Sequence, residues 1–233
     1  MEAREFKDGI FEQLARVGGA FGSPKRVEIV DLLAQGSRSV ESIALATGMT
    51  VANTSRHLGI LRNTGLVTSQ RDGLYVIYRL SDDSVGAGYQ ALRTLAETRL
   101  AEVRQLAEAF FGEVDGVEPI SLDELLARSS SGDVVVVDVR PHLEYDAGHL
   151  PGAINIPLDK LEGCLSDFDQ NASVVAYCRG PYCVMSAEAV AQLRRAGFQA
   201  QRFDGGPLEW RSAGLDLMVD SRGDQATLEA SAN

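Results

Sequence analysis

The chain has 233 residues, of which 45% are hydrophobic and 24% are charged, and this composition is typical of globular domains. It contains no apolar run near the roughly 18–20 residues that a bilayer span needs, so it predicts neither a transmembrane segment nor a membrane partner. Charged residues are interleaved at the N-terminus, which predicts no secretory signal. Three cysteines are too few for a disulfide framework and favour a reducing cytoplasm.

The net charge of −11 is unevenly distributed along the chain. Residues 1–112 hold 13 basic and 13 acidic residues, whereas residues 113–233 hold 9 and 20. Within residues 37–80 the local charge is +3, which is compatible with phosphate contact. The basic residues of that stretch are Arg38, Arg56, Arg62, Arg71 and Arg79. This asymmetry predicts two domains with different partners.

Helical spacing dominates the first half and is interrupted once by a hairpin signal. Apolar periodicity and capping residues predict helices over 1–17, 24–36, 40–47 and 50–63. Asp72-Gly73 lies between two β-rich runs and predicts a tight hairpin. A helical pattern over 82–111 follows, and its apolar stripe needs a partner to bury it.

This order of elements is that of a winged helix-turn-helix, and one segment resembles the ArsR-type repressors. The residues that match the family pattern are Ser55, His57, Leu58, Leu61, Arg62, Gly65, Leu66 and Val67. The resemblance covers roughly residues 5–110. It implies a homodimeric repressor that binds double-stranded operator DNA.

The helix over 50–63 carries the predicted DNA contacts. Leu58 and Leu61 face the core, which leaves short polar and cationic groups on the solvent side, where they reach base edges and phosphates. A solvated surface helix is the alternative interpretation, and the hairpin together with the family pattern favours DNA binding. The predicted DNA-binding residues are Thr50, Asn53, Thr54, Ser55 and Arg56, with Arg71 at the hairpin tip.

Many ArsR-type proteins sense metals through cysteine pairs or through clusters of histidine and acidic residues. Residues 1–163 contain no cysteine, and Asp82, Asp83 and Glu97 lack a histidine partner on the long helix. The sequence therefore predicts no metal site and no cofactor, and it locates the sensor in the second half.

The second half alternates helices with apolar strands. A turn-rich stretch over 113–119 is the predicted linker, and the polar segment 220–233 is predicted to be disordered. Helices are predicted over 122–128, 158–163 and 186–196, and strands over 134–139, 174–177 and 199–203. The alternation predicts a domain over 120–219 of the α/β class with a parallel sheet. The first domain then spans 1–112.

Three segments of this half resemble a rhodanese domain. The first segment comprises Asp138-Val139-Arg140, Glu144-Tyr145 and residues 148–157. The second is the loop 177–183, and the third is residues 203–210. In the loop, Cys178 ends a strand, and backbone N–H groups with a helix N-terminus are expected to point at its sulfur. Together with Arg179 this arrangement predicts a lowered thiol pKa and a stabilised persulfide. The predicted site consists of Cys178, Arg179, Gly180, Pro181, Tyr182 and Cys183.

Two features of this loop bear on its chemistry. A phosphatase-type loop needs an arginine where Val184 stands, so the loop resembles the sulfurtransferase version instead. Cys183 departs from the family pattern, because a polar or cationic residue usually ends the loop. It either forms a disulfide or polysulfide bridge with Cys178 or is an inert residue at the helix start. A structural role suffices for Cys164.

Two functions from different classes follow. In the first, the protein is a transcriptional regulator whose rhodanese module senses or accepts sulfane sulfur from thiosulfate, polysulfide or a persulfide. A persulfide on Cys178, or its bridge to Cys183, then alters operator affinity through the linker and the long helix. The alternative is a sulfurtransferase active at Cys178, with the winged helix serving for tethering or dimerisation.

Overall fold

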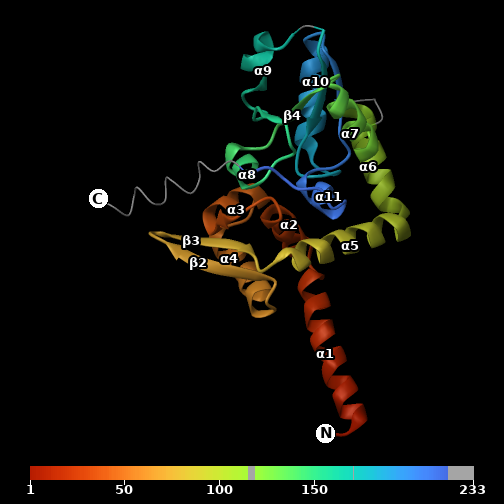
Figure 1. Ribbon diagram of the computed structural model, residues 1–233. Coiled ribbons are helices and arrows are strands. Elements are labelled where there is room, and N and C mark those ends of the chain that lie inside the picture. Colours follow the sequence, from red (N-terminus) through yellow and green to blue (C-terminus); the bar gives the residue numbers. More distant parts are fainter. Residues whose placement is uncertain (115–118, 170, 220–233) are drawn as a thin grey trace. The chain divides into compact units, whose positions relative to one another are not determined.

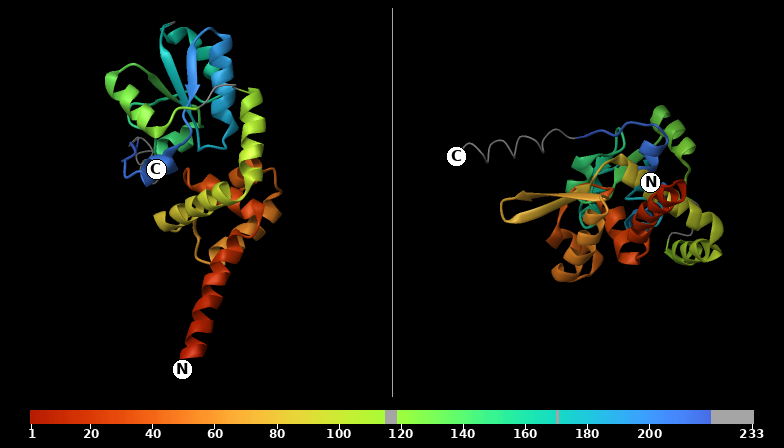
Figure 2. Two further views of the ribbon diagram at one scale, coloured as in Figure 1. Left: turned by 90° about the vertical axis from the view of Figure 1, so that its right-hand side faces the viewer. Right: turned by 90° about the horizontal axis from the view of Figure 1, so that it is seen from below.

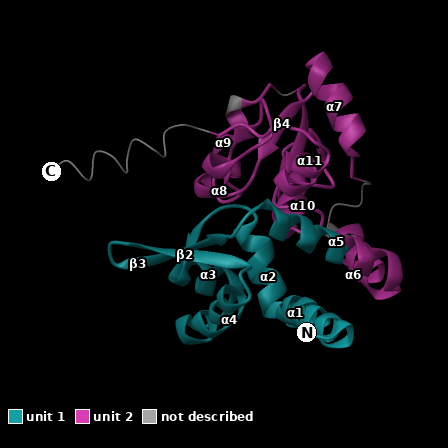
Figure 3. Ribbon diagram, turned by 60° about the horizontal axis from the view of Figure 1, so that its bottom comes forward, with its two compact units in different colours: residues 1–93 teal, residues 94–233 magenta. Residues whose placement is uncertain are grey.

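The computed structural model describes residues 1–114, 119–169 and 171–219, and the chain divides into two compact units, 1–93 and 94–233 (Figure 3). We call them the first and the second unit. This division lies upstream of the predicted domain boundary at residue 112. The predicted linker 113–119 falls largely outside the described residues, and the predicted tail 220–233 falls wholly outside them.

The first unit is mainly helical. Its elements are α1 (Ala3–Phe21), α2 (Pro24–Leu33), β1 (Arg38–Ser39), α3 (Val40–Thr47), α4 (Val51–Asn63), β2 (Val67–Asp72), β3 (Tyr75–Leu80) and most of α5 (Asp83–Arg99). The side chains of Ser39 and Thr50 cap α3 and α4, because each accepts a hydrogen bond from a backbone N–H three residues on. Gly48 turns the chain between these helices in the left-handed conformation, at φ 64°.

The hairpin of the first unit has the predicted position. β2 and β3 pair antiparallel from Val67↔Leu80 to Asp72↔Tyr75, which leaves a two-residue turn at Gly73 and Leu74. Gly73 has φ 57°, as the tight turn requires. β1 joins the other side of β3, and the hairpin projects from the helices around it (Figure 1).

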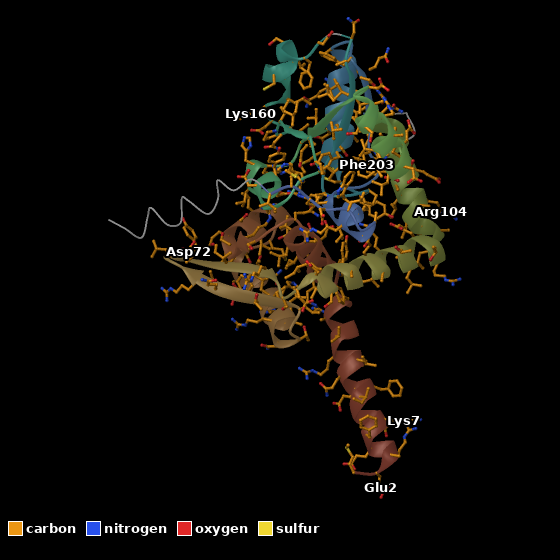
Figure 4. The ribbon with its side chains drawn as sticks, viewed as in Figure 1. Glu2, Lys7, Asp72, Arg104, Lys160 and Phe203 are labelled. Carbon is orange, nitrogen blue, oxygen red and sulfur yellow. The ribbon has the colours of Figure 1, made fainter. Side chains whose placement is uncertain are left out.

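α1 differs from its predicted form. The helix continues through Gly18 and Gly19 to Phe21, because an interior glycine costs only about 1 kcal/mol and does not end a helix by itself. It extends from the rest of the first unit (Figures 1 and 4), and its apolar side chains are exposed in the single chain, Phe11 by 65% and Leu14 by 61%.

The predicted long helix over 82–111 is two helices. α5 ends at Arg99 and α6 (Ala101–Val114) begins after Leu100, where the sequence has neither proline nor glycine. α6 belongs to the second unit and packs there: it contacts α10 (Val184–Arg195), and the Arg202 guanidinium lies 4.2 Å from the centre of the Phe111 ring. The helix therefore breaks at Leu100 because of the tertiary contacts of α6, although the apolar spacing of the sequence continues through this residue.

The second unit is an α/β fold with a parallel sheet. After α6 its elements are α7 (Leu122–Ser131), β4 (Val135–Asp138), α8 (His142–Ala147), β5 (Ile154–Asn155), α9 (Leu161–Cys164), η1 (Leu165–Asp167), β6 (Ser173–Tyr177), α10, β7 (Gln199–Arg202) and α11 (Pro207–Ser212). The strand order is β5-β4-β6-β7 and every pairing is parallel. Helices cover both faces, with α7 and α10 on opposite sides of the strands (Figure 2).

The strand period places the functional loop. Along β6, Val174 and Ala176 pack on the α10 side, whereas Val175 and Tyr177 pack on the side of α7 and α11. Cys178 continues this alternation and therefore lies on the α10 side, within the core. None of the helices in the described residues is both long and apolar enough to span a bilayer.

Candidate functional site

One candidate surface lies on α4 of the first unit. Five of the six predicted DNA-binding residues are solvent-exposed: Thr50, Asn53, Ser55, Arg56 and Arg71. The Thr50 hydroxyl oxygen accepts a hydrogen bond from Asn53 N at 3.3 Å, so it caps the helix while its neighbours stay available to a partner.

Thr54 is the exception, and its prediction as a solvent-side residue is wrong. Its side chain is fully buried and its hydroxyl donates to the Thr50 carbonyl at 3.0 Å. Thr54, Leu58 and Leu61 are spaced by four and three residues, so all three lie on the core face of α4. A buried threonine with a satisfied hydroxyl does not contact a base.

The hairpin adds cationic groups to this surface. Arg71 is exposed close to the tip, where Asp72 is labelled in Figure 4, and its Nε donates to the Gly73 carbonyl at 3.3 Å. Arg62 on α4 and Arg79 on β3 are exposed as well. Both belong to the stretch 37–80 with its local charge of +3, so they are further candidates for phosphate contact. Arg38 of the same stretch is buried and donates to Ser42.

The second candidate site is the loop Cys178–Cys183, which we call the thiol loop. It connects the carboxyl end of β6 to α10, whose N-cap residue is Cys183. Carboxyl ends of parallel strands are the usual place for ligand sites in α/β folds. The predicted strand, loop and helix are therefore found, with the helix starting at Val184.

Two ion pairs hold the surroundings of the thiol loop, one of them fully buried and the other partly buried. Arg179 Nη2 lies 2.6 Å from Glu144 Oε1 on α8, and Arg179 Nε lies 2.9 Å from the other oxygen. Arg140 pairs in the same way with Asp138 at 2.6 Å, and the Tyr177 hydroxyl donates to Asp138 at 2.6 Å. The charge of Arg179 is therefore largely neutralised by Glu144, a partner that the sequence reasoning did not assign.

Gly206 also shapes the thiol loop, which sequence reasoning missed. A Cβ at this position would lie 2.6 Å from the carbonyl oxygens of Cys178 and Arg179. Only glycine allows the loop backbone to approach so closely. The pair Gly205-Gly206 in the third rhodanese-like segment is the sequence feature that could have predicted this contact.

The two thiols of the loop have different environments. Cys178 has no exposed surface, whereas Cys183 is partly exposed. Cys178 Sγ lies 3.2 Å from Ser186 Oγ and 3.4 Å from the Cys183 carbonyl oxygen, and it is hydrogen-bonded to the Cys183 sulfur. The backbone N–H of Arg179 donates to the Cys183 sulfur, whereas the Cys183 side chain accepts no capping hydrogen bond from α10. Cys164 is half-buried beside the same core.

These environments move the two pKa values apart. Burial raises the pKa of the Cys178 thiol well above its usual value, and its hydrogen bond to Cys183 raises it further. The hydrogen bond from Cys178 lowers the pKa of Cys183 to about 7, and the backbone N–H and the positive charge of Arg179 contribute to this lowering. The predicted lowering of the Cys178 pKa is therefore wrong, because burial outweighs the hydrogen bonds that the Ser186 hydroxyl and backbone N–H direct at the Cys178 sulfur.

Within the described ranges no group of three or more histidine, cysteine, aspartate or glutamate side chains lies close enough together to hold a metal ion.

Comparisons with known proteins match both units. Residues 23–69 match the family "Bacterial regulatory protein, arsR family", and residues 121–213 match the family "Rhodanese-like domain". The HTH-type transcriptional regulator Rv0324 of Mycobacterium tuberculosis is 44% identical over 211 residues, which cover 91% of this chain and 92% of the relative.

Two further relatives each match one part of the chain. A sulfurtransferase of Allochromatium vinosum is 29% identical over 107 residues, 46% of this chain and 96% of the relative. The solved homodimeric winged helix-turn-helix DNA-binding domain Mb0332 of Mycobacterium bovis is 38% identical and covers 43% of this chain and 91% of that domain, with a TM-score of 0.40.

Fold and sequence together define a transcriptional regulator with a winged helix-turn-helix and a rhodanese-like domain. The chain belongs to the arsR family of bacterial regulatory proteins and carries the rhodanese-like domain at its C-terminal side. The predicted family resemblance and the predicted fold class are confirmed.

Proposed function

We propose that this regulator binds operator DNA as a homodimer in the cytoplasm, and that its rhodanese-like domain accepts sulfane sulfur as a cysteine persulfide that changes DNA affinity. The observation that carries the proposal is a thiol loop with two hydrogen-bonded sulfurs in the same chain as an exposed, polar α4. Thiosulfate, polysulfides and persulfides are the class of donor that such a loop fits.

DNA recognition rests on α4 and the β2–β3 hairpin. Asn53 and Ser55 have the hydrogen-bonding groups that read base edges in a major groove, and Arg56 and Arg71 neutralise phosphates. The test is fluorescence anisotropy of the full chain with the DNA upstream of its own gene and with a shuffled duplex of equal length. Tighter binding to the upstream DNA supports the proposal, and equal affinities contradict it.

Homodimer formation rests on the apolar surface of α1. The exposed apolar residues of this helix are Phe6, Ile10, Phe11, Leu14 and Val17. A second copy related by a two-fold axis buries such a surface and presents two α4 helices to the half-sites of a palindrome. Leu106 on α6 is also exposed and belongs to the apolar stripe that was predicted to need a partner.

Sedimentation velocity of the full chain tests the dimer. Leu14→Glu introduces a charge into the apolar surface of α1 and is expected to yield monomers. Gln13→Glu introduces the same charge at a neighbouring polar position and is the matched control. A wild-type chain that sediments as a monomer at micromolar concentration contradicts the proposal.

Sulfur acceptance rests on the thiol loop, whose two sulfurs are hydrogen-bonded to each other. Mass spectrometry of the full chain after exposure to inorganic polysulfide tests it. We expect modification of the wild type and none in the Cys178→Ser/Cys183→Ser double variant. Sulfur found on Cys164 alone would contradict the assignment.

A route between the thiol loop and the DNA-binding helices passes through α5. The Tyr182 hydroxyl donates to Glu97 Oε1 at 2.8 Å, and Glu97 belongs to the part of α5 that lies in the second unit. The same helix begins at Asp83 in the first unit. A rearranged thiol loop therefore acts on a helix that is continuous with the first unit. A tenfold change in operator affinity requires only about 1.4 kcal/mol of coupling.

Tyr182→Phe tests this route because it removes the hydroxyl and retains the ring. We expect the variant to take up sulfur normally. The change in operator affinity on sulfur loading is expected to be up to about fivefold smaller than in the wild type, because the lost hydrogen bond contributes about 1 kcal/mol. A sulfur response equal to that of the wild type would exclude the Tyr182–Glu97 route.

The alternative function is catalytic sulfur transfer, and the match of the second unit to a sulfurtransferase over 96% of that protein's length favours it. Thiocyanate formation from thiosulfate and cyanide distinguishes the two. An enzyme shows repeated turnovers, whereas a sensor releases at most the sulfur already held on its loop. Sustained turnover with unchanged operator affinity would favour the enzyme.

A further inference from the structure

The two thiols of the loop differ in their access to a donor from solution. Cys178 lies in the core beneath α10 with no exposed surface, and Val190 and Leu193 belong to the same cluster. Cys183 lies at the N-cap of α10 and is partly exposed. A donor molecule with several heavy atoms therefore meets the sulfur of Cys183 before that of Cys178.

The polar groups around the loop also favour Cys183 as the nucleophile. Its sulfur accepts hydrogen bonds from the backbone N–H of Arg179 and from the thiol of Cys178, and these donors stabilise a thiolate there. The Ser186 hydroxyl and backbone N–H are directed at the Cys178 sulfur, but burial outweighs them and keeps that thiol protonated. Cys178 is protonated, and its thiol is hydrogen-bonded to the Cys183 thiolate.

We infer that Cys183 takes the sulfane sulfur from the donor first and that Cys178 then resolves the Cys183 persulfide, which leaves a Cys178–Cys183 disulfide and free sulfide. This inference rests on the proposed function, because it assumes that the thiol loop accepts sulfane sulfur. It assigns the entry point to Cys183 and makes a disulfide the end state of the loop.

The first step is an exchange at sulfur. The Cys183 thiolate attacks the outer sulfur of a persulfide donor, R–S–SH, and forms a new S–S bond. The S–S bond of the donor breaks, and its electron pair leaves on R–S⁻. The products are the Cys183 persulfide and the donor thiolate, so atoms and charge balance.

The second step is the resolution by Cys178. Its sulfur attacks the Sγ atom of the Cys183 persulfide, the bond to the outer sulfur breaks, and the outer sulfur leaves with that electron pair. The proton of the Cys178 thiol passes to the departing group, which leaves as H₂S. The two cysteine sulfurs are oxidised to a disulfide and the sulfane sulfur is reduced to sulfide, so the donor supplies the oxidising equivalents.

The titration of the two groups supports this order. The pKa of Cys183 is lowered to about 7, chiefly by the hydrogen bond from Cys178, so about half of this residue is thiolate at neutral pH. Burial raises the pKa of Cys178, so it retains the proton that the departing sulfide needs. Cys178 becomes a competent nucleophile only when the reacting sulfur is already beside it.

The test exposes the full chain to cysteine persulfide and measures intact mass together with released sulfide. The wild type is expected to lose two hydrogens and to release one sulfide per chain. Cys178→Ser is expected to retain one extra sulfur on Cys183. Cys183→Ser is expected to react at least about fivefold more slowly at neutral pH, because its smaller thiolate fraction outweighs the higher nucleophilicity of a less acidic thiol. Cys164→Ala is the control with wild-type behaviour.

Three outcomes separate the claims. A Cys183→Ser chain that loads Cys178 at the wild-type rate overturns the inference and leaves the proposed function intact. A wild-type chain that retains the extra sulfur without forming a disulfide overturns the resolving role of Cys178. No sulfur transfer to the wild type or to any variant overturns the proposed function itself.

One measurement on the wild type makes the test independent of how the variants fold. At neutral pH, iodoacetamide is expected to alkylate Cys183 faster than Cys178, as peptide mapping reports. Faster alkylation of Cys178 would contradict the assignment of Cys183 as the first nucleophile.

Discussion

Both candidate sites are built at the start of a helix, but the N-cap side chain has a different role in each. α4 begins after Thr50, whose side chain satisfies an N–H group of the helix, and Asn53 and Arg56 are exposed to an external partner. α10 begins after Cys183, whose side chain leaves the helix uncapped and whose sulfur is hydrogen-bonded to the Cys178 thiol. The DNA-binding surface thus offers side chains to an external partner, whereas the reactive loop brings two of its own sulfurs together.

The largest effect is expected from Gly206→Ala, which tests how strictly the loop backbone is held. The new Cβ would lie 2.6 Å from backbone atoms of Cys178 and Arg179, so the loop must shift. We expect loss of sulfur uptake and destabilisation of the second unit by about 1–3 kcal/mol, measured by mass spectrometry and thermal unfolding. Gly163→Ala, with no atom within 4 Å of the added group, is the control. Wild-type uptake by Gly206→Ala would contradict this view of the loop.

The next effect separates the exposed face of α4 from its buried face. Asn53→Ala is expected to lower operator affinity by about 1–3 kcal/mol, the usual contribution of a base-reading side chain. Thr54→Val retains the buried volume, and its operator affinity is expected to equal that of the wild type. Anisotropy titrations with operator DNA measure both. A loss of affinity in Thr54→Val alone, at unchanged thermal stability, would show that α4 reads DNA through a different face.

A pH profile distinguishes the two thiols. Alkylation requires the thiolate, which forms above the pKa, so the rate at Cys183 is expected to rise about tenfold from pH 6 to pH 8 and then level off. In Cys183→Ser the rate at Cys178 is expected to continue rising above pH 8. Iodoacetamide is suitable because the reagent itself does not titrate. A flat profile between pH 6 and pH 8 in the wild type would contradict the assignment.

The smallest effect is expected from Arg56→Ala, which tests whether α4 contacts phosphate. Its operator affinity should decrease several-fold at low salt, and the logarithmic salt slope should become shallower by about one. Arg104→Ala removes an equally exposed arginine on α6 and is expected to leave the slope unchanged. Equal slopes for wild type and Arg56→Ala would exclude a phosphate contact at this residue.

Local patterns were sufficient to predict most of the fold. The capped helix Val40–Thr47 and the Asp72-Gly73 turn are found at their predicted positions because local hydrogen bonds and glycine geometry determine them. The break at Leu100 was not predictable, since it depends on the packing of α6 against α10. β1 and β5 have two residues each, too few for a periodic pattern.

The candidate sites show the same limit. Spacing identified the exposed residues of α4, but at Thr54 the polar side chain suggested exposure while the position on the helix faces the core. The sequence indicated that the loop holds two thiols but not which of the two pKa values is raised by burial and which is lowered. That difference depends on the three-dimensional course of the loop against Gly206 and α10.

The central claim is that the sulfur state of the thiol loop sets the affinity of α4 for DNA. The most direct measurement is an operator titration of the full chain, reduced and after polysulfide treatment, beside the Cys178→Ser/Cys183→Ser variant treated in the same way. The account predicts about a tenfold difference between the two wild-type states, or about 1.4 kcal/mol, and none for the variant. Equal affinities of the reduced chain and a fully modified wild-type chain would contradict it.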